Sequence, residues 1–368
     1  MTQEIVKCME DDFGNPSSLH RMGVIAEKRI RSARRSIAMQ LGVTDGEIYF
    51  TSGGTEADNA ALYGAAQALK RRGNRIITSK IEHPAVLETC RKLASSGFEV
   101  IYVGTDSKGR ADIGEIEQHI NDRTILISLM HVNNETGTIQ PLEAIGLLAK
   151  HGGICFHSDA VQSFGKLSLA PHKSGLDMLS LSAHKIHGPK GVGAMYIRNG
   201  CRIDPLIVGG GQENGARSGT ENVPGIAGFA KAAEIICSGQ NAKMKDMAKV
   251  RAYLLRGIKD EIGDIRINSL EADGCSPAIL NVSFEGTRGE VLLHMLEQSD
   301  IFVSTGSACS SKRKNRSHVL KAMGLSDSQI DSAIRFSFSE FNTIEEMDQT
   351  LDRLKTAVKS MRKTLKGL

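Results

Sequence analysis

The 368-residue chain has no tryptophan, and aromatic residues make up only 4% of it. No apolar run reaches the about 18 residues that a spanning helix needs, so no membrane span is expected. The first residues, MTQEIVKCMEDDFG, also lack the apolar core of a signal peptide. The formal net charge is only +4, with both signs mixed along the chain, which gives no indication of nucleic-acid binding.

The seven cysteines lie far apart, and no CxxC pair occurs among them. An odd number at such spacings indicates neither a disulfide framework nor a zinc knuckle. No metal site is predicted, and a reducing, cytoplasmic location fits this cysteine usage best.

Short apolar runs alternate with amphipathic, helix-like stretches in the first two thirds of the chain. The predicted strands are 47–52, 75–80, 98–103, 124–132, 154–160, 176–183 and 191–198, and the clearest helices between them are 56–73, 84–97 and 142–153. This alternation predicts an α/β fold with a mostly parallel seven-stranded sheet covered on both faces.

The pattern changes after a long helix predicted over 222–238. Residues 243–262 are predicted to be helical, and 278–284, 301–304 and 333–338 to be short strands. We therefore predict a large domain over 1–240 and a smaller C-terminal α+β domain over 241–368.

Polar residues follow several of the predicted strands, at the sheet edge where α/β proteins bind ligands. The stretch SGGTEADN has small residues and Thr55 at a helix start, which suits a phosphate but is also compatible with an ordinary helix cap. His83, before Pro84, and the cluster around Asn134 are either site residues or surface turns.

Two further strand ends carry charged residues. Asp159, followed by Gln162, ends a strand that should be buried, where a carboxylate needs a cationic partner or hydrogen bonds, unless it only caps a helix. Lys185 follows the next strand, and such a lysine either reaches solvent or reacts covalently. A lysine, an acidic partner for a ring nitrogen, a stacking histidine and a phosphate cradle together meet the requirements of pyridoxal phosphate.

These residues resemble the fold-type I pyridoxal-phosphate enzymes of the class V aminotransferase family, and within it the cysteine desulfurases of the NifS/IscS type. The resemblance covers nearly the whole chain. The motifs that carry it are FGNPSSLH, TSGGTEADN, EHPAV, HVNNETGTIQP, HSDAVQS, SAHKIHGPKGVG, GGGQENGARSGTENV, STGSACSS and IRFSF.

The resemblance implies a role for each matching position. Lys185 would bind the cofactor covalently, Asp159 would pair with the pyridine nitrogen and Gln162 would hydrogen-bond the phenolic oxygen. His83 would stack on the ring and transfer protons. The other residues implied to bind the cofactor are Gly54, Thr55, Asn134, Ser182, His184 and, from the neighbouring subunit of a homodimer, Thr220.

For the substrate, L-cysteine, the resemblance implies that Asn134 and Arg335 hold the carboxylate. Cys309 would take the sulfur as a persulfide and pass it to an acceptor, such as an iron–sulfur scaffold or a tRNA-thiolation protein. The basic run Lys312 to Arg316 either favours the thiolate, or steers an acidic partner, or is a solvated face.

The sequence is also compatible with two other functions. One is a selenocysteine lyase or another class V enzyme. The other is a weakly active homologue that serves as a partner in a sulfur-transfer complex, because the Asp/Asn-Ala-Thr-Thr segment that usually precedes FGNPSS in the family is absent.

Overall fold

The computed structural model describes residues 1–306 and 316–366. The chain divides into two compact units. Unit 1 comprises Met1–Val103, Asp112–His131 and Pro141–Gln240, and unit 2 comprises Gly104–Ala111, Val132–Gln140 and Asn241–Leu368. The domains predicted from the sequence, 1–240 and 241–368, stay a prediction.

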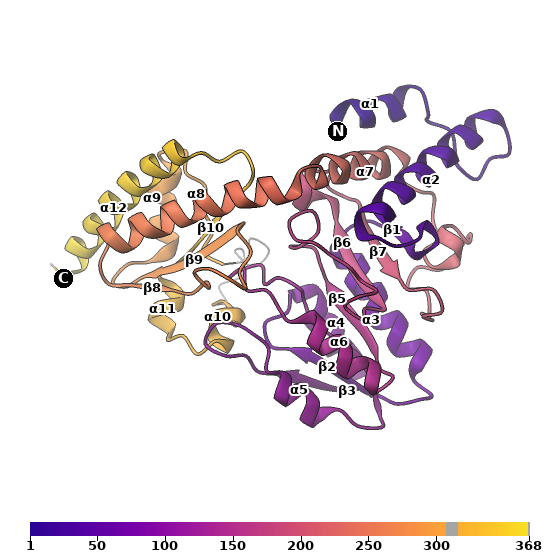
Figure 1. Cartoon of the computed structure of the whole chain (residues 1–368), viewed down its shortest axis with the longest axis horizontal. Helices are drawn as coiled ribbons and strands as arrows, with labels where there is room; N and C mark the ends of the chain where they lie inside the picture. Colours follow the sequence, from indigo (N-terminus) through magenta and orange to yellow (C-terminus); the bar gives the residue numbers. More distant parts are fainter. Residues whose placement is uncertain (307–315, 367–368) are drawn as a thin grey trace. The chain divides into compact units, whose positions relative to one another are not determined.

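Unit 1 contains a seven-stranded sheet in the order β1-β7-β6-β5-β4-β2-β3 (Figure 1). Its strands are β1 (Ile48–Thr51), β2 (Arg75–Ser79), β3 (Glu99–Val103), β4 (Thr124–Ser128), β5 (Cys155–Asp159), β6 (Met178–Ser182) and β7 (Gly193–Ile197). β7 pairs antiparallel with both β1 and β6, and the other neighbours are parallel, so β7 runs against the other six strands. The predicted mostly parallel seven-stranded sheet is confirmed.

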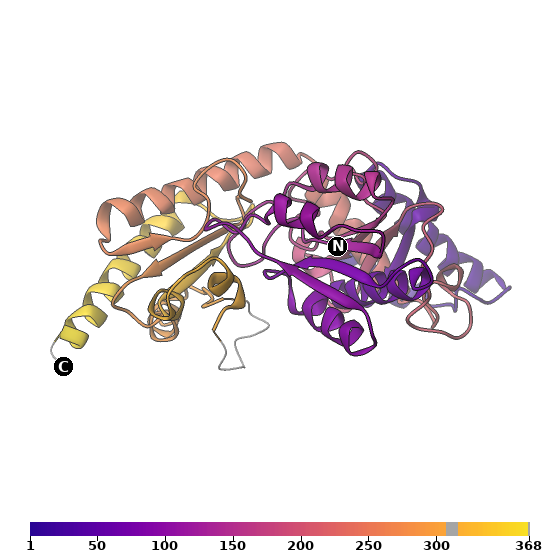
Figure 2. The same cartoon turned by 90° about the horizontal axis from the view of Figure 1, so that it is seen from below.

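Helices cover both faces of this sheet, with α3 and α4 on one face and α5 and α6 on the other (Figure 2). Every residue of β4 to β7 is buried, as expected for strands covered on both sides. The helices of unit 1 are α1 (Thr2–Glu10), α2 (Arg21–Leu41), α3 (Gly54–Leu69), α4 (Pro84–Ser95), α5 (Ile113–His119), α6 (Leu142–His151) and α7 (Val223–Cys237).

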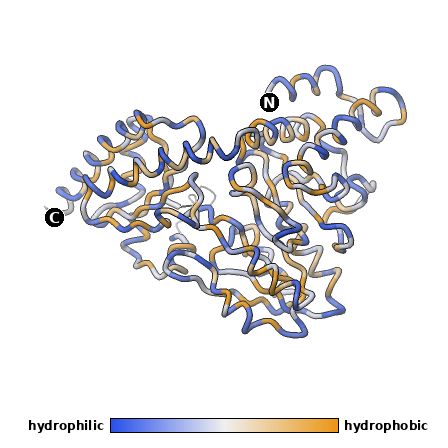
Figure 3. Tube along the Cα trace, viewed as in Figure 1, coloured by the Kyte–Doolittle hydropathy of each residue, from blue (hydrophilic) through white to orange (hydrophobic). Residues whose placement is uncertain are grey.

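Unit 2 contains a three-stranded antiparallel sheet in the order β10-β9-β8. Its elements are α8 (Gln240–Glu261), β8 (Ile265–Ile267), β9 (Ile279–Phe284), α9 (Gly289–Glu297), α10 (His318–Ala322), α11 (Asp327–Asp331), β10 (Ala333–Ser337) and α12 (Ile344–Lys366). Apolar side chains of α8, α9 and α12 pack with those of β9 and β10 in one core. The alternation of hydrophobic and hydrophilic residues along α8 and α12 is visible in Figure 3.

Some predicted elements differ from the structure. The predicted strand over 301–304 is wrong, because only Ser304 pairs there, in an isolated bridge with Arg335. The run IFVS is apolar enough for a strand, but it has no longer partner segment beside it. Conversely, β8 is only three residues long and too short for its alternation to be recognised in the sequence.

A buried ion pair fixes the glycine-rich loop that precedes Thr220. Nη1 and Nη2 of Arg34, on α2, lie 2.7 and 2.8 Å from the two carboxylate oxygens of Glu213. One of these oxygens also accepts a hydrogen bond of 2.8 Å from the backbone N–H of Phe50. Because Glu213 is 5% exposed and pairs with residues far away in the sequence, it ties this loop to α2 and β1.

We expect the change Glu213→Gln to lower the free energy of unfolding by about 3 kcal/mol, because it leaves the Arg34 guanidinium, whose side chain is 17% exposed, without its counter-charge. Chemical denaturation followed by circular dichroism measures this loss. The matched control is Glu27→Gln, which breaks the exposed pair between Arg31 and Glu27 and should cost less than about 1 kcal/mol. Equal losses in the two variants would contradict the role of the buried pair.

Candidate active site

Six of the seven strands in unit 1 have their carboxyl ends at one edge of the sheet, and most of the predicted cofactor residues follow these ends. β1 leads to Gly54 and Thr55, and β2 to His83. β6 ends at Ser182 and leads to His184 and Lys185. β5 ends at Asp159 itself. This is the edge at which open α/β sheets bind ligands.

Asp159 is a buried carboxyl group, 6% exposed. Its Oδ1 accepts a hydrogen bond of 2.9 Å from the backbone N–H of Val161, and within the described part of the chain Oδ2 accepts none. Burial raises the pKa of Asp159 to about 6, against the opposing effects of the Val161 N–H and the positive charge of Lys185. A cationic N–H donor at Oδ2 would stabilise the ionised form further.

Lys185 lies on a single 3-10 turn, η2 (Ala183–Ile186), directly after β6, and its side chain is half-buried. β5 and β6 are neighbours with Asp159 opposite Ser180, and the Lys185 charge lowers the pKa of Asp159. Gly188 packs tightly against the same turn, since a Cβ there would lie 2.9 Å from that of Ala183. The turn therefore carries an amine whose charge acts on the Asp159 carboxyl group, the pKa of which is about 6.

The start of α3 has the features of a phosphate site. No side chain caps this 16-residue helix, and Thr55 is exposed in its first turn. A Cβ at Gly54 would lie 2.6 Å from Cγ2 of Val161 and 3.5 Å from Cβ of Ser182, so the helix start lies against the ends of β5 and β6. Uncapped N–H groups and the helix dipole favour an anion at this point.

His184 and Ser182 lie beside that helix start. The Nδ1 atom of His184 lies 2.8 Å from the Ser182 hydroxyl oxygen. Burial, together with the positive charge of Lys185, lowers the pKa of His184. Both side chains can donate hydrogen bonds to an anion without adding a fixed charge to the site.

His83 caps the N-terminus of α4 through its ring. Nδ1 accepts a hydrogen bond of 3.1 Å from the backbone N–H of Ala85, so the neutral ring carries its proton on Nε2. The amide of Asn59 donates to the carbonyl oxygens of Thr55 at 2.8 Å and Ala85 at 3.4 Å. The starts of α3 and α4 are thereby held side by side, which brings the His83 segment close to the predicted phosphate site.

A layer of buried polar side chains behind Asp159 was not identified from the sequence. His157, two residues earlier on β5, is fully buried, and its ring nitrogens lie 2.9 Å from the hydroxyls of Ser128 and Ser180. Burial lowers the pKa of His157 to about 3, so the ring is neutral. The period-2 pattern of β5 places His157 and Asp159 on the same face, and this spacing is the signal that could have revealed it.

Two more buried carboxyl groups, Asp58 on α3 and Glu82 before α4, neighbour Asp159 in the same layer. Burial raises the pKa of both, and the charge of Asp159 raises them further. The pKa of Glu82 rises to about 8, while its carboxyl group bonds to the Ser79 hydroxyl at 2.5 Å and the Met130 N–H at 2.9 Å. Asp159, with a pKa of about 6, is therefore ionised at neutral pH, whereas Glu82, with a pKa of about 8, keeps its proton.

This proton on Glu82 has a measurable consequence for stability. The unfolded chain releases it near pH 4.5, whereas the folded protein holds it to about pH 8, so stability contributed by Glu82 is full below pH 4.5 and falls as the pH rises towards 8. Relative to Glu82→Gln, wild type should lose about 1.4 kcal/mol of unfolding free energy per pH unit between about pH 5 and pH 7.5. Urea unfolding across this range measures the slope, and parallel curves would mean that Glu82 is ionised in the folded protein.

Gln162 is half-buried in the turn after β5. Thr220 is exposed and follows Arg217, whose Nε lies 3.0 Å from Oε1 of Glu56 in the first turn of α3. The roles predicted for Gln162 and Thr220 stay predictions.

Unit 2 holds the residues predicted to bind substrate. Nη1 of Arg335, on β10, donates to the main-chain oxygen of Asn134 at 3.0 Å. Glu135 is buried beside them and accepts from the Ser317 hydroxyl at 2.5 Å. Burial raises the pKa of Glu135, and Ser317, His318 and Arg335 oppose this shift. The segment around Asn134 thus folds with the strand that carries Arg335, although the two lie 201 residues apart.

Cys309 and three residues of the basic run, Lys312, Arg313 and Lys314, lie outside the described residues. The last residue of that run, Arg316, binds the carboxylates of Asp331 at 2.7 Å and Asp327 at 2.8 Å. Its charge is therefore already paired within unit 2.

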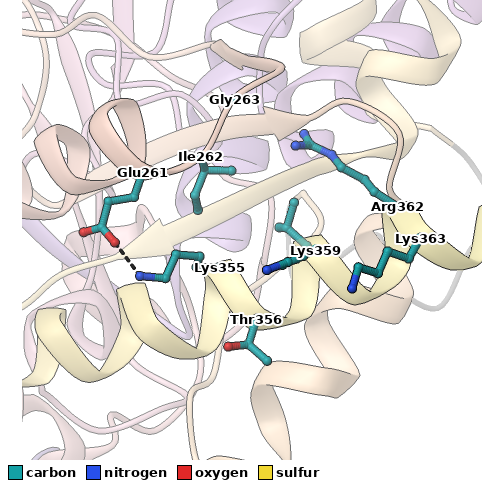
Figure 4. A pocket seen from close by; sticks show the side chains of 9 residues that line it. Glu261, Ile262, Gly263, Lys355, Thr356, Lys359, Arg362 and Lys363 are labelled. Atoms are coloured by element: carbon teal, nitrogen blue, oxygen red, sulfur yellow. Dashed lines mark hydrogen bonds and ion pairs between the residues drawn. The ribbon is translucent and has the colours of Figure 1, made fainter.

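A hollow between α8 and α12 of unit 2 contains none of the predicted site residues. It is lined by Glu261, Ile262, Gly263, Lys355, Thr356, Val358, Lys359, Arg362 and Lys363 (Figure 4). Nζ of Lys355 is paired with Glu261 at 2.6 Å. This hollow is not the candidate active site, because its one acid, Glu261, is already paired and none of the strand-end residues lines it.

Among the described residues, no group of three or more His, Cys, Asp and Glu side chains could hold a metal ion. None of the helices in the described part of the chain is long and apolar enough to cross a membrane.

The aminotransferase class-V family model matches residues 1–350. The chain belongs to the class-V aminotransferase family. The resemblance inferred from the motifs is thereby confirmed, as is the cofactor, because enzymes of this family depend on pyridoxal phosphate. The residues at the sheet edge fit this group: Lys185 can bind it covalently, Asp159 can accept from a ring N–H, and the start of α3 can hold its phosphate.

Relatives and solved structures give more detail within the family. A cysteine desulfurase IscS from Dictyoglomus turgidum is 43% identical over 96% of this chain and 90% of its own. One from Proteus mirabilis is 45% identical over 98% of this chain and 90% of its own. A solved NifS-like protein is 41% identical, with a TM-score of 0.91 over 97% of this chain and 94% of its own. A structure described as SspA in complex with cysteine is 36% identical, with a TM-score of 0.81 over 93% and 95%.

Proposed function

We propose that this protein is a pyridoxal-phosphate-dependent cysteine desulfurase, which converts L-cysteine to L-alanine and transfers the sulfur to Cys309 as a persulfide. The observation that carries the proposal is the position of Asp159 at the end of β5 and of Lys185 directly after the neighbouring strand β6, where the Lys185 charge acts on the Asp159 pKa, in a chain 43% identical to a cysteine desulfurase over nearly its whole length.

The bound cofactor supplies an electron sink for the electrons released at the substrate Cα. Asp159, with a pKa of about 6, supports this chemistry because its negative charge would keep a ring N–H in place. The amine of Lys185 removes the proton from the substrate Cα. Arg335 holds the substrate carboxylate, which its planar guanidinium suits.

Sulfur transfer requires the thiolate of Cys309. The thiolate attacks the sulfur of the bound cysteine, the bond between that sulfur and Cβ breaks, and the new S–S bond makes the persulfide. Proton return to the remaining three-carbon fragment gives alanine. In sum, one cysteine and one Cys309 thiol become one alanine and one persulfide, which a thiol of the acceptor then takes over.

Mass spectrometry of the intact protein and of its peptides tests this directly. After incubation with L-cysteine and without a reductant, the peptide with Cys309 should carry one additional sulfur atom, which a reducing thiol removes. Alanine formation with no added sulfur on Cys309 would favour another class V activity, and no alanine at all would favour a binding partner over an enzyme.

The proposal includes a homodimer in which Thr220 contacts the phosphate in the partner's site, with an iron–sulfur scaffold or a tRNA-thiolation protein as the acceptor and the cytoplasm as the location. The loop of Thr220 is well suited to such a role, because Glu213 and Arg217 anchor it while Thr220 itself stays exposed.

Sedimentation of the active protein should give about twice the mass of one chain. The change Thr220→Val should weaken cofactor binding without changing that mass. An active monomer would contradict the assignment of Thr220.

A further inference from the structure

Two cysteines outside the candidate active site lie close together in unit 1. Cys155 is the first residue of β5, and Cys201 follows the end of β7. Their sulfur atoms are 3.9 Å apart. Asp159 lies at the opposite end of β5, so this pair is separate from the predicted cofactor residues.

Both cysteines line a surface pocket of about 560 Å³, a volume that suits a small molecule. Cys155 is 8% exposed, whereas Cys201 is half-buried and therefore the more accessible thiol. Neither cysteine is used by the proposed desulfurase chemistry.

The pocket is positively charged. Its cationic lining residues are Arg72, Lys150, Arg198 and Arg202. Asp177 is the one acid among the lining residues, and it is already paired with Arg198, at 2.6 Å from Nη2. The three cationic side chains other than Arg198 favour a ligand that carries negative charge.

The two thiols differ in reactivity. The contact with the Cys155 sulfur and the charge of Arg198 lower the pKa of Cys201, against the opposing effects of burial and of Asp177. The same contact and burial raise the pKa of Cys155. Because Cys201 is the more exposed of the two thiols and the thiolate is the nucleophile, Cys201 is the attacking thiol and Cys155 the thiol that resolves the product.

We propose that Cys155 and Cys201 form a dithiol site that reacts with small anionic disulfides and closes into an intramolecular disulfide. The Cys201 thiolate attacks one sulfur of the small disulfide, forms a mixed disulfide and releases one thiolate. Cys155 gives up its proton and attacks the Cys201 sulfur, the bond between the two cysteines forms, and the second thiolate leaves. Two cysteine thiols are oxidised, one small disulfide is reduced to two thiols, and the cysteine protons end on those thiols.

The closing step requires the two sulfurs to move from 3.9 Å to about 2.05 Å. Cys201 lies in a turn next to Gly200, which has a φ of +88°, and not within a strand. Side-chain rotation and a small shift of this turn bring its sulfur towards Cys155, while the strand that carries Cys155 stays in place.

The test uses the intact protein, with glutathione disulfide as the anionic probe and cystamine as its cationic counterpart. After each incubation the free thiols are alkylated and all cysteine peptides are mapped by mass spectrometry. We expect a Cys155–Cys201 cross-link that forms several-fold faster with glutathione disulfide than with cystamine. Cys237 is the internal control, because it is also half-buried but does not line this pocket.

Variants separate the two roles. Cys155→Ser should stop the reaction at a glutathione mixed disulfide on Cys201, and Cys201→Ser should leave Cys155 reduced. Arg202→Gln should slow the reaction with glutathione disulfide and not that with cystamine. The proposal is overturned if no cross-link forms, if Cys201 reacts no faster than Cys237, or if cystamine is the faster reagent.

Discussion

Replacing Lys185 with alanine is expected to lower alanine formation from L-cysteine by about 10²–10⁴-fold and to remove the visible absorbance of the covalently bound cofactor. The proposed function gives Lys185 two roles: it binds the cofactor and it moves the proton of the substrate Cα. No other side chain at this sheet edge repeats its position directly after β6. Steady-state alanine assays and absorbance spectra of the purified protein measure both effects.

The matched control for this change is Lys190→Ala, which removes an exposed lysine five residues further along the chain. It should leave both the spectrum and the rate close to those of wild type. If Lys185→Ala formed alanine at the wild-type rate, the covalent and proton-transfer roles of Lys185 would both be wrong.

The positions of the strand-end residues could be predicted because each is a local property of the sequence. A short apolar run predicts the strand, and the polar residue after it then lies at the carboxyl edge. His83 is an example, since Pro84 starts α4 and leaves His83 as its cap. The same reasoning places Lys185 after β6 and Asp159 at the end of β5.

The protonation of the buried layer could not be predicted in this way. The pKa values of Asp58 and Glu82 depend on how deeply each group is buried and on how far each lies from Asp159. The packing of α3 and α4 on the sheet sets both quantities. The contact between Arg335 and Asn134 likewise joins residues 201 positions apart. Local sequence patterns show neither how deeply a side chain is buried nor which residues pair when they lie far apart in the chain.

The second large effect is expected for Cys309→Ser. A serine hydroxyl is not ionised near neutral pH and cannot form the persulfide, so the variant should lose sulfur transfer and about 10²-fold or more of its alanine formation. Cofactor absorbance should be unchanged, because Lys185 and Asp159 remain. This combination distinguishes a missing acceptor thiol from a damaged cofactor site. The control is Cys237→Ser, which replaces a half-buried cysteine outside the site and should keep full activity.

Alanine release from L-cysteine, by wild type and by Cys309→Ser, with and without a reducing thiol, tests the account most directly. Without the added thiol, wild type should release a burst of about one alanine per subunit and then slow sharply, because only the substrate thiol is left to discharge the persulfide. With the thiol, wild type should turn over continuously and Cys309→Ser should remain nearly inactive. Continuous alanine release by Cys309→Ser at the wild-type rate would contradict the proposed function.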